Sequence, residues 1–393
     1  MANAARQAAN GGSLAPGMSD TLDDLLRRRL ELGPITVADY MRLALGHPTL
    51  GYYRTRDPLG VVPDGSGLGL PSAAGAGGDF VTAPECSQMF GELLGLWSAH
   101  VWGLLGQPDP VNFVELGPGR GTMMADALRA VRLVAPGFHA AVRVHLVETS
   151  PVLRARQAKA LEGEAVEWHE RLADLPPGPF ILLANEFLDA LPIHQLVKHN
   201  GQWRERQVAL TEAGDFGFQP GKAASPLARL LTPTVADAPE TSIAEVSPAI
   251  RGVVSAISRR LAHYGGAALL IDYGYADPAA GDSLQAVRRH QYHPVLQDPG
   301  EADLTAHVDF SAVGAAARLS GVDVHGPIEQ GAFLTRLGIV ERAQRLVRDA
   351  DADKAKDVVE GMHRLIAPDR MGSLFKVIGL GPAGLSALPG FLN

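Results

Sequence analysis

Cysteine is nearly absent from this sequence of 393 residues, in which Cys86 is the single example. One cysteine excludes an internal disulfide and a metal site built from several thiolates. No basic residue stands next to Cys86 in the sequence, so we expect a small buried side chain rather than a nucleophile. This composition fits a protein of a reducing compartment.

Long apolar runs and an excess of basic residues are also missing. No run of about 18 apolar residues occurs, so no membrane-spanning helix is expected. The 35 lysines and arginines are outnumbered by 43 aspartates and glutamates, which gives a net charge of -8. Binding to nucleic acid requires a clustered basic face, so no nucleic-acid partner is expected. No signal peptide is evident, and the expected location is cytoplasmic in a bacterium or the mitochondrial matrix in a eukaryote.

The length and the composition predict a globular protein of one large domain with additions, or of two domains. Residues 1–18 are rich in Gly, Ala and Asn and are expected to form a disordered tail. Residues 19–105 are predicted to form an N-terminal helical region with a flexible glycine-rich loop at 59–78, a candidate lid. The main domain is expected at 106–393, with an insertion at about 194–245.

The main domain alternates short apolar runs with helical patterns, which is typical of an α/β fold with a parallel sheet. Strands are predicted at 111–116, 142–148, 165–169, 180–185 and 267–273, and helices at 122–134 and 151–161. Later elements are a helix from Ser247 to about 263, a helix at 310–319, a strand at 322–327, a helix pair and a final strand at 373–380.

Three further segments complete the prediction. Alternating runs on either side of Asn200-Gly201 predict a β-hairpin within 194–210. Residues 215–239 are predicted to be a loop. In the N-terminal region, helical spacing predicts one helix near 22–30, a second capped by Thr36 and a third opened by Thr82 and Pro84.

The first functional signal is the glycine turn after the predicted strand 111–116. Gly117, Gly119 and Gly121 alternate with other residues, whereas a dinucleotide fingerprint has G-x-G-x-x-G. Glycines there allow close approach of backbone N–H groups to a ligand. Glu115 lies just before them, and its carboxylate would repel a diphosphate but attract a sulfonium and an α-ammonium. The pattern therefore favours S-adenosylmethionine over NAD.

The second signal is Glu148, which ends the next predicted strand. An acidic side chain at this place can accept hydrogen bonds from both ribose hydroxyls of a nucleoside. The alternative is a charge that only complements the N-terminus of the following helix. We favour the ribose role because the glycine turn supplies the matching context.

The third signal is the polar segment after the predicted strand 180–185, where Asn185, Glu186 and Asp189 occur. Ligands of open α/β sheets bind outside the carboxyl ends of the strands, so these side chains should face the cofactor. Asn185 and Asp189 could equally be helix caps. Glu186 fits a cap poorly, and we predict that it orients the methyl acceptor.

Two weaker clusters remain open between functional and structural interpretations. Asp79, Thr82 and Glu85 either close over the cofactor or complement a helix dipole. His307 and Asp309 could suggest a metal site, but two such residues commonly cap helices, and catalytic zinc normally has three close protein ligands. No metal is expected.

Six segments make the sequence resemble the MidA-like S-adenosylmethionine-dependent methyltransferases, a family that includes the mitochondrial complex I assembly arginine methyltransferase. They are GDFVTAPE (78–85), ELGPGRG (115–121), VETSPVLR (147–154), ANEFLDALP (184–192), DLTAHVDF (303–310) and MGSLFK (371–376). The resemblance implies a Rossmann-like, seven-strand class I methyltransferase sheet with an N-terminal helical addition and inserted substrate elements. One departure is the Gly/Ser-rich run at 61–77, which is longer than the family's usual link and leaves the target open.

The family's mitochondrial members symmetrically dimethylate an arginine of a core complex I subunit. The resemblance therefore implies a protein-arginine N-methyltransferase with a protein substrate, for which a complex I core subunit is the candidate. A guanidinium must be held by carboxylates, and we assign that work to Glu186, with Asp189, His307 and Asp309 as possible helpers. The rivals are a small-molecule methyltransferase, a cofactor-binding assembly chaperone without catalysis and an NAD-dependent oxidoreductase. The oligomeric state stays open.

Overall fold

The computed structural model describes residues 21–55, 82–385 and 387–391. The predicted tail at 1–18, the glycine-rich loop at 59–78 and Asp79 lie outside the described residues. None of the described helices is both long and apolar enough to cross a membrane.

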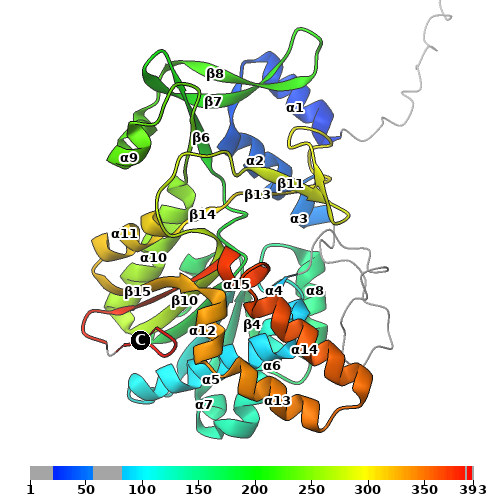
Figure 1. The fold of residues 1–393 in the computed structure, drawn as a ribbon, viewed down its shortest axis with the longest axis vertical. Coiled ribbons are helices and arrows are strands. Elements are labelled where there is room, and N and C mark those ends of the chain that lie inside the picture. The colour runs from blue at the N-terminus through cyan, green and yellow to red at the C-terminus, as the bar shows by residue number, and fades with distance from the viewer. Residues whose placement is uncertain (1–20, 56–81, 386, 392–393) are drawn as a thin grey trace, which may run out of the picture.

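A mixed sheet dominated by parallel strands forms the centre of the main domain (Figure 1). Its continuous order is β15-β16-β10-β5-β2-β3-β4, with the short β14 also paired to β10. Only β16 runs antiparallel to its neighbours. The five predicted central strands are confirmed. The strands are β2 (Val111–Leu116), β3 (Val142–Val147), β4 (Val166–His169), β5 (Phe180–Asn185), β10 (Gly266–Tyr275), β14 (Val308–Asp309), β15 (Val322–Glu329) and β16 (Phe375–Pro382).

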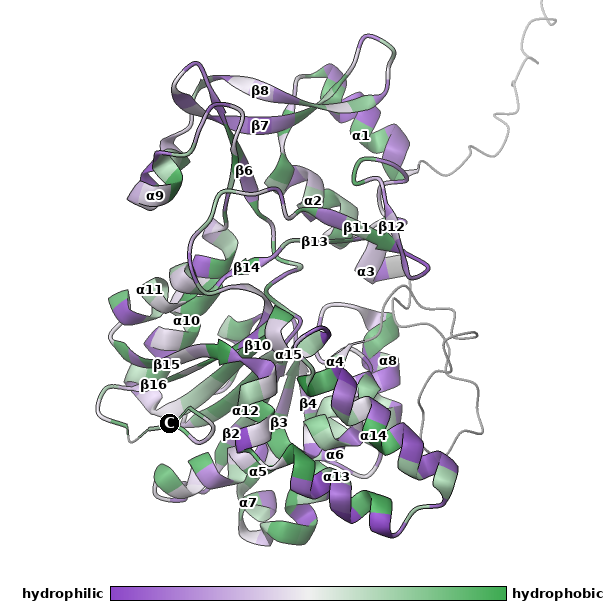
Figure 2. Ribbon diagram, viewed as in Figure 1, coloured by the Kyte–Doolittle hydropathy of each residue, from purple (hydrophilic) through white to green (hydrophobic). Residues whose placement is uncertain are grey.

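Helices cover both faces of this sheet because the central strands are apolar on both sides. Phe113 of β2 faces one core and Val114 faces the other. Figure 2 shows the hydrophobic colour of these strands, and the mixed colours of the outer helices. The first core is covered by α5 (Gln88–Leu104), α6 (Thr122–Val134), α7 (Pro136–Ala141), α12 (Gln330–Arg336), α13 (Ile339–Arg348) and α14 (Ala352–Ile366), and the second by α10 (Pro248–Tyr264) and α11 (Phe310–Leu319).

The N-terminal helices pack against the inserted strands beyond the carboxyl ends of the sheet (Figure 1). Thr21 forms a capping box with Asp24, and Thr36 caps the second helix as predicted. The hairpin turn at Asn200-Gly201 is confirmed, with both residues at positive φ. This region contains α1 (Leu22–Glu31), β1 (Ile35–Thr36), α2 (Val37–Gly46), α3 (Tyr52–Thr55), β6 (His194–His199), β7 (Gln202–Leu210) and β9 (Ile243–Val246).

The prediction of a loop at 215–239 is wrong. This segment contains β8 (Phe216–Ala224), the 3-10 helix η2 (Pro226–Leu230) and α9 (Pro233–Ala236). Strand β8 pairs with β7, and the guanidinium of Arg206 lies 3.8 Å from the ring centroid of Phe218. Cross-strand pairing thus overrides the turn-like composition.

Three other segments are more structured than the patterns predicted. The predicted third helix is split at Ser87 into α4 (Ala83–Cys86) and α5. The polar segment after β10 contains β11 (Gln285–Arg288), β12 (Gln291–His293) and β13 (Asp303–Thr305). Four helices, not two, precede the last strand, the fourth being α15 (Met371–Leu374). Cys86 is buried, as expected, and burial raises the pKa of its thiol to about 12.

Candidate active site

The main cavity of the described structure lies where β2, β3 and β5 end. In the sheet register Leu116 is paired with Val147 and with Ala184, so the residues that follow these three strands meet at one edge. The cavity has a volume of about 540 Å³. Its wall is built by residues 115–120, 122–123, 147–149, 170–172, 185–187 and 190–192 of the main domain, and by Met41, Arg42, Leu45, Gly46, Tyr53 and Arg54 of the N-terminal helices.

The glycine turn forms the floor of this cavity. Gly117, Gly119 and Gly121 have φ values of 61°, 54° and 85°, a region that side chains with a Cβ rarely adopt. Gly117 and Gly119 line the cavity. Gly121 does not line it, but it is the N-cap of α6 and carries no capping side chain. The N–H groups of Gly117 and Gly121 donate to the carbonyl oxygens of Val147 and Pro118, so a ligand meets the turn at Gly119 and at the uncapped first turn of α6.

Glu148 lies on the cavity wall at the end of β3. Its Oε1 accepts a hydrogen bond of 2.7 Å from the backbone N–H of Ser150, and its Oε2 accepts one of 3.3 Å from Gln157. Burial raises the pKa of Glu148, while these bonds oppose the rise. Carboxylate oxygens have more than one acceptor site each, so Glu148 can still accept from a ligand.

Gln157 on α8 (Pro151–Ala160) is a positioning residue that the sequence reasoning missed. It is fully buried, and its Nε2 also donates to the carbonyl oxygen of Gly119 at 2.8 Å. The indole of Trp168 donates to its Oε1 at 2.9 Å. Gln157 follows the apolar Leu153 by four residues and so lies on the buried face of α8. A polar residue at such a position is the sequence signal that could have revealed it.

Glu115 is the buried carboxylate beside the glycine turn. It is 2% exposed and lines the cavity, and its Oε2 has no hydrogen-bond partner among the described residues. Burial raises its pKa from 4.5 to about 8. An unpartnered buried carboxylate is unfavourable unless a cationic or hydrogen-bonding ligand meets it.

Glu85 ties α4 to the glycine turn. Its carboxylate accepts a bond of 2.6 Å from the hydroxyl of Thr122 and forms an ion pair of 3.3 Å with Arg120. Thr82 and Glu85 both line the cavity. This position is compatible with the hypothesis that their segment closes over the cofactor. Thr82 is the N-cap of α4 but makes no side-chain capping bond.

Glu186 faces the cavity from the turn after β5. Its backbone has a φ of 49°, which a non-glycine residue adopts only where surrounding contacts enforce it. Its Oε1 accepts bonds from the backbone N–H of Ala83 at 2.9 Å and from the amide of Asn185 at 3.0 Å. Burial raises its pKa to about 7. No described lysine or arginine forms an ion pair with Glu186.

Asp272, at the carboxyl end of β10, holds that turn and was also missed. Its Oδ2 accepts from three successive backbone N–H groups, those of Phe187, Leu188 and Asp189, at 3.1, 2.8 and 3.2 Å. Asp189 itself is buried behind the cavity wall, where burial raises its pKa to about 6 and Tyr273 donates to it. The predicted helper is thus close to Glu186 in sequence but does not line the cavity.

A family described as "Putative S-adenosyl-L-methionine-dependent methyltransferase" matches residues 93–328, more than half of the chain. The chain belongs to this family. It is 36% identical over 391 residues to "Protein arginine methyltransferase NDUFAF7, mitochondrial" of Xenopus laevis, with 92% of this chain and 84% of that protein covered. The Drosophila melanogaster homolog is 34% identical over 400 residues, with 94% and 87% covered. Both relatives are mitochondrial by name, in agreement with the matrix alternative for a eukaryotic chain.

A solved structure supports the same cofactor for this methyltransferase. A protein from Burkholderia thailandensis, crystallised with S-adenosyl-homocysteine, has a TM-score of 0.77 and 29% identity, with 94% of this chain and 93% of that chain covered. A native crystal structure from the same organism has a TM-score of 0.78 and 31% identity, with 95% and 94% covered. The cofactor is S-adenosylmethionine, as the sequence predicted. The orphaned Oε2 of Glu115 and the open glycine turn fit this cofactor.

The other two predicted catalytic residues lie elsewhere in the methyltransferase. His307 and Asp309 line a separate cavity of about 40 Å³ together with Tyr275. Asp309 caps α11 by accepting a hydrogen bond of 2.9 Å from the N–H of Ala312. Helix capping was the predicted alternative to a metal site. The ring of His307 packs edge-on against Tyr273 at 5.5 Å. The structure does not bring this pair to the cofactor cavity.

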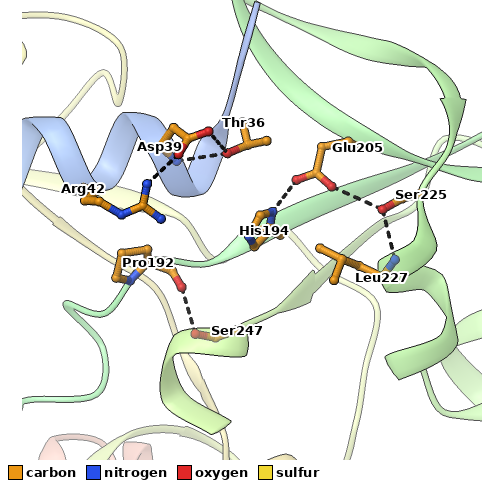
Figure 3. A network of polar contacts seen from close by, with 9 residues as sticks. All are labelled: Thr36, Asp39, Arg42, Pro192, His194, Glu205, Ser225, Leu227 and Ser247. Atoms are coloured by element: carbon orange, nitrogen blue, oxygen red, sulfur yellow. Dashed lines mark hydrogen bonds and ion pairs between the residues drawn. The ribbon is translucent and has the colours of Figure 1, made fainter. Parts of the chain in front are cut away.

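Figure 3 shows polar contacts around Arg42 and Pro192, two residues that line the cavity. Arg42 is held by Asp39 at 2.5 Å, and the hydroxyl of Thr36 donates to the same carboxylate at 2.8 Å. The carbonyl oxygen of Pro192 accepts from Ser247 at 2.8 Å.

Proposed function

We propose that this methyltransferase transfers the methyl group of S-adenosylmethionine to an arginine side chain of a protein. The observation that carries the proposal is Glu186, a half-buried carboxylate on the cavity wall that forms no ion pair with a described lysine or arginine. The names of the relatives, which are protein arginine methyltransferases, support the same acceptor for this protein.

Three groups of residues hold the cofactor in this proposal. The carboxylate of Glu148 accepts hydrogen bonds from the ribose hydroxyls, because it ends β3 at the cavity wall. Glu115 receives the α-ammonium group, which neutralises its buried charge. Gly119 and the uncapped first turn of α6 complete the site. Bound S-adenosylmethionine supplies an electrophilic methyl group on a sulfonium.

In this proposal Glu186 binds and orients the arginine acceptor. A carboxylate can hold a guanidinium through two parallel N–H bonds and so aim one nitrogen at the methyl group. With a pKa near 7, the same carboxylate can take the proton that the methylated nitrogen releases. Asp189 acts indirectly, because it is buried behind the wall and only its backbone belongs to the turn that carries Glu186.

The test adds labelled S-adenosylmethionine and the purified methyltransferase to a lysate that lacks this protein. We expect label in one polypeptide, recovered as dimethylarginine after hydrolysis. The family resemblance predicts the symmetric isomer and a complex I core subunit as the labelled chain. Glu186→Gln should lose at least tenfold in transfer with unchanged cofactor affinity, whereas the exposed Glu212→Gln should match the wild type.

A second variant separates cofactor binding from transfer. Gly119→Val forces a branched side chain into a left-handed conformation, so cofactor binding and transfer should both be lost. Label confined to small metabolites would replace the proposal with a small-molecule methyltransferase. Cofactor binding by the wild type without any label would favour the assembly chaperone. Full transfer by Glu186→Gln would remove the role given to this residue.

A further inference from the structure

A cluster of two histidines and a glutamate lies at the β4 edge of the central sheet, outside the cavity wall. In the parallel register His145 of β3 is paired with Glu167 of β4, and Val147 with His169. Side chains two residues apart on a strand share one face, so all three point to the same side. One ligand atom from each residue lies within 4.8 Å of the others.

The hydrogen bonds of Asn112 determine which ring nitrogen of His145 carries the hydrogen. The amide nitrogen of Asn112 donates to the carbonyl oxygen of Pro177 at 3.4 Å, which leaves its Oδ1 as the acceptor toward His145. This oxygen lies 3.1 Å from Nε2 of His145, so Nε2 carries the hydrogen. The lone pair of Nδ1 then points toward Nε2 of His169, 3.0 Å away. Metal-binding histidines are oriented in the same manner, with the second ring nitrogen donating to an oxygen.

We propose that His145, Glu167 and His169 form a binding site for a divalent transition-metal ion, with zinc as the best match. Two imidazoles and one carboxylate are a common zinc ligand set that leaves a fourth position open. Two nitrogens on one tetrahedral zinc lie about 3.3 Å apart, so the histidine pair has to open only slightly.

Burial and charge at the cluster support this site. His145 is 2% exposed, while the carboxylate of Glu167 is 71% exposed and gives an ion access from solvent. Asp174 lies close enough to His169 for an electrostatic interaction and adds negative charge nearby. None of the three ligands lines the cofactor cavity, so the ion is distinct from the methyl-transfer machinery.

The experiment titrates the full chain with zinc by calorimetry and with cobalt by absorption spectroscopy. The wild type should bind one zinc ion per chain, and cobalt should show the visible bands of a tetrahedral complex. His169→Ala and Glu167→Gln should each lower the affinity at least tenfold. Asn112→Ala removes the orienting oxygen together with the amide that donates to Pro177, and it should weaken binding by about 10–100-fold.

The chain has 13 histidines, so weak unspecific binding has to be separated from the site. His363→Ala removes an exposed histidine of α14 and should leave the affinity unchanged. Glu167 is exposed, so its glutamine variant keeps the fold, as circular dichroism without metal would verify. Equal zinc affinity of the wild type, Glu167→Gln and His169→Ala would overturn the proposal, as would failure of the wild type to bind zinc.

Discussion

The side-chain amide of Gln157 donates to the carbonyl oxygen of Gly119 across 2.8 Å and links α8 to the glycine turn. The same nitrogen reaches Glu148 at 3.3 Å. One buried side chain therefore sets the distance between the two elements to which we assign cofactor binding.

Replacing Gln157 by leucine should weaken cofactor binding without unfolding the protein. The change leaves the carbonyl of Gly119 and the indole N–H of Trp168 without partners, which is worth about 1–3 kcal/mol. We expect a loss of roughly 5- to 150-fold in affinity for S-adenosylmethionine, measured by calorimetry. Gln202→Leu, at an exposed position of β7, is the matched control. Equal affinities of the two variants would contradict the positioning role.

Glu115 should make the stability of the cofactor-free protein depend on pH. Its folded pKa of about 8 lies above the ordinary value of 4.5, so the folded state binds the extra proton between these values. Stability is then lost as the pH rises from 4.5 to 8. Glu115→Gln removes this loss and should raise the free energy of unfolding at pH 8 by a few kcal/mol, to order of magnitude. At pH 4 urea unfolding should show no difference, and an equal gain at both pH values would exclude this cause.

Cofactor binding should release a proton from the same carboxyl group. Below pH 8 Glu115 is protonated in the free protein, and a bound ammonium group favours the charged form. Affinity should therefore rise between pH 6 and pH 8. Calorimetry in buffers of different ionisation enthalpy measures the released proton directly. The release should be smaller in Glu115→Gln, and an unchanged value would assign the proton to another group.

The ion pair between Glu92 and Arg342 should stabilise the contact of α13 with α5. Two bonds of 2.7 and 3.1 Å join the pair, and the carboxylate is only 5% exposed. Arg342→Met leaves this carboxylate with weaker partners and should lower the free energy of unfolding by about 1–3 kcal/mol in urea. Arg345→Met, on the exposed side of the same helix, should have little effect. A larger loss in the control would refute the assignment.

The sequence predicted the parts of the site that depend on local patterns. The apolar run of β2 followed by three alternating glycines defines a strand, a turn and a helix start within a dozen residues, and the structure contains all three. Glu115 and Glu148 could be located because each lies at the end of such a strand. Local spacing also predicted the cap at Thr36, whereas the capping box between Thr21 and Asp24 was not predicted.

The remaining features depend on contacts between distant residues. β8 becomes a strand because it pairs with β7, although its own composition is typical of a loop. Asp272 lies within the apolar strand β10 and carries no motif, and its three N–H partners are more than 80 residues away in the sequence. His307 and Asp309 belong to a segment that carries the family resemblance, but the fold directs them to another cavity.

The three N–H bonds accepted by Asp272 have a consequence for the entropy of the reaction. They fix the backbone of residues 187–189, next to Glu186, while the chain folds and before any ligand is present. The ordering of this turn is therefore completed during folding, and no part of it has to be repeated in each catalytic cycle. In the proposed function, the acceptor would meet a carboxylate whose direction is already set by bonds from Ala83 and Asn185.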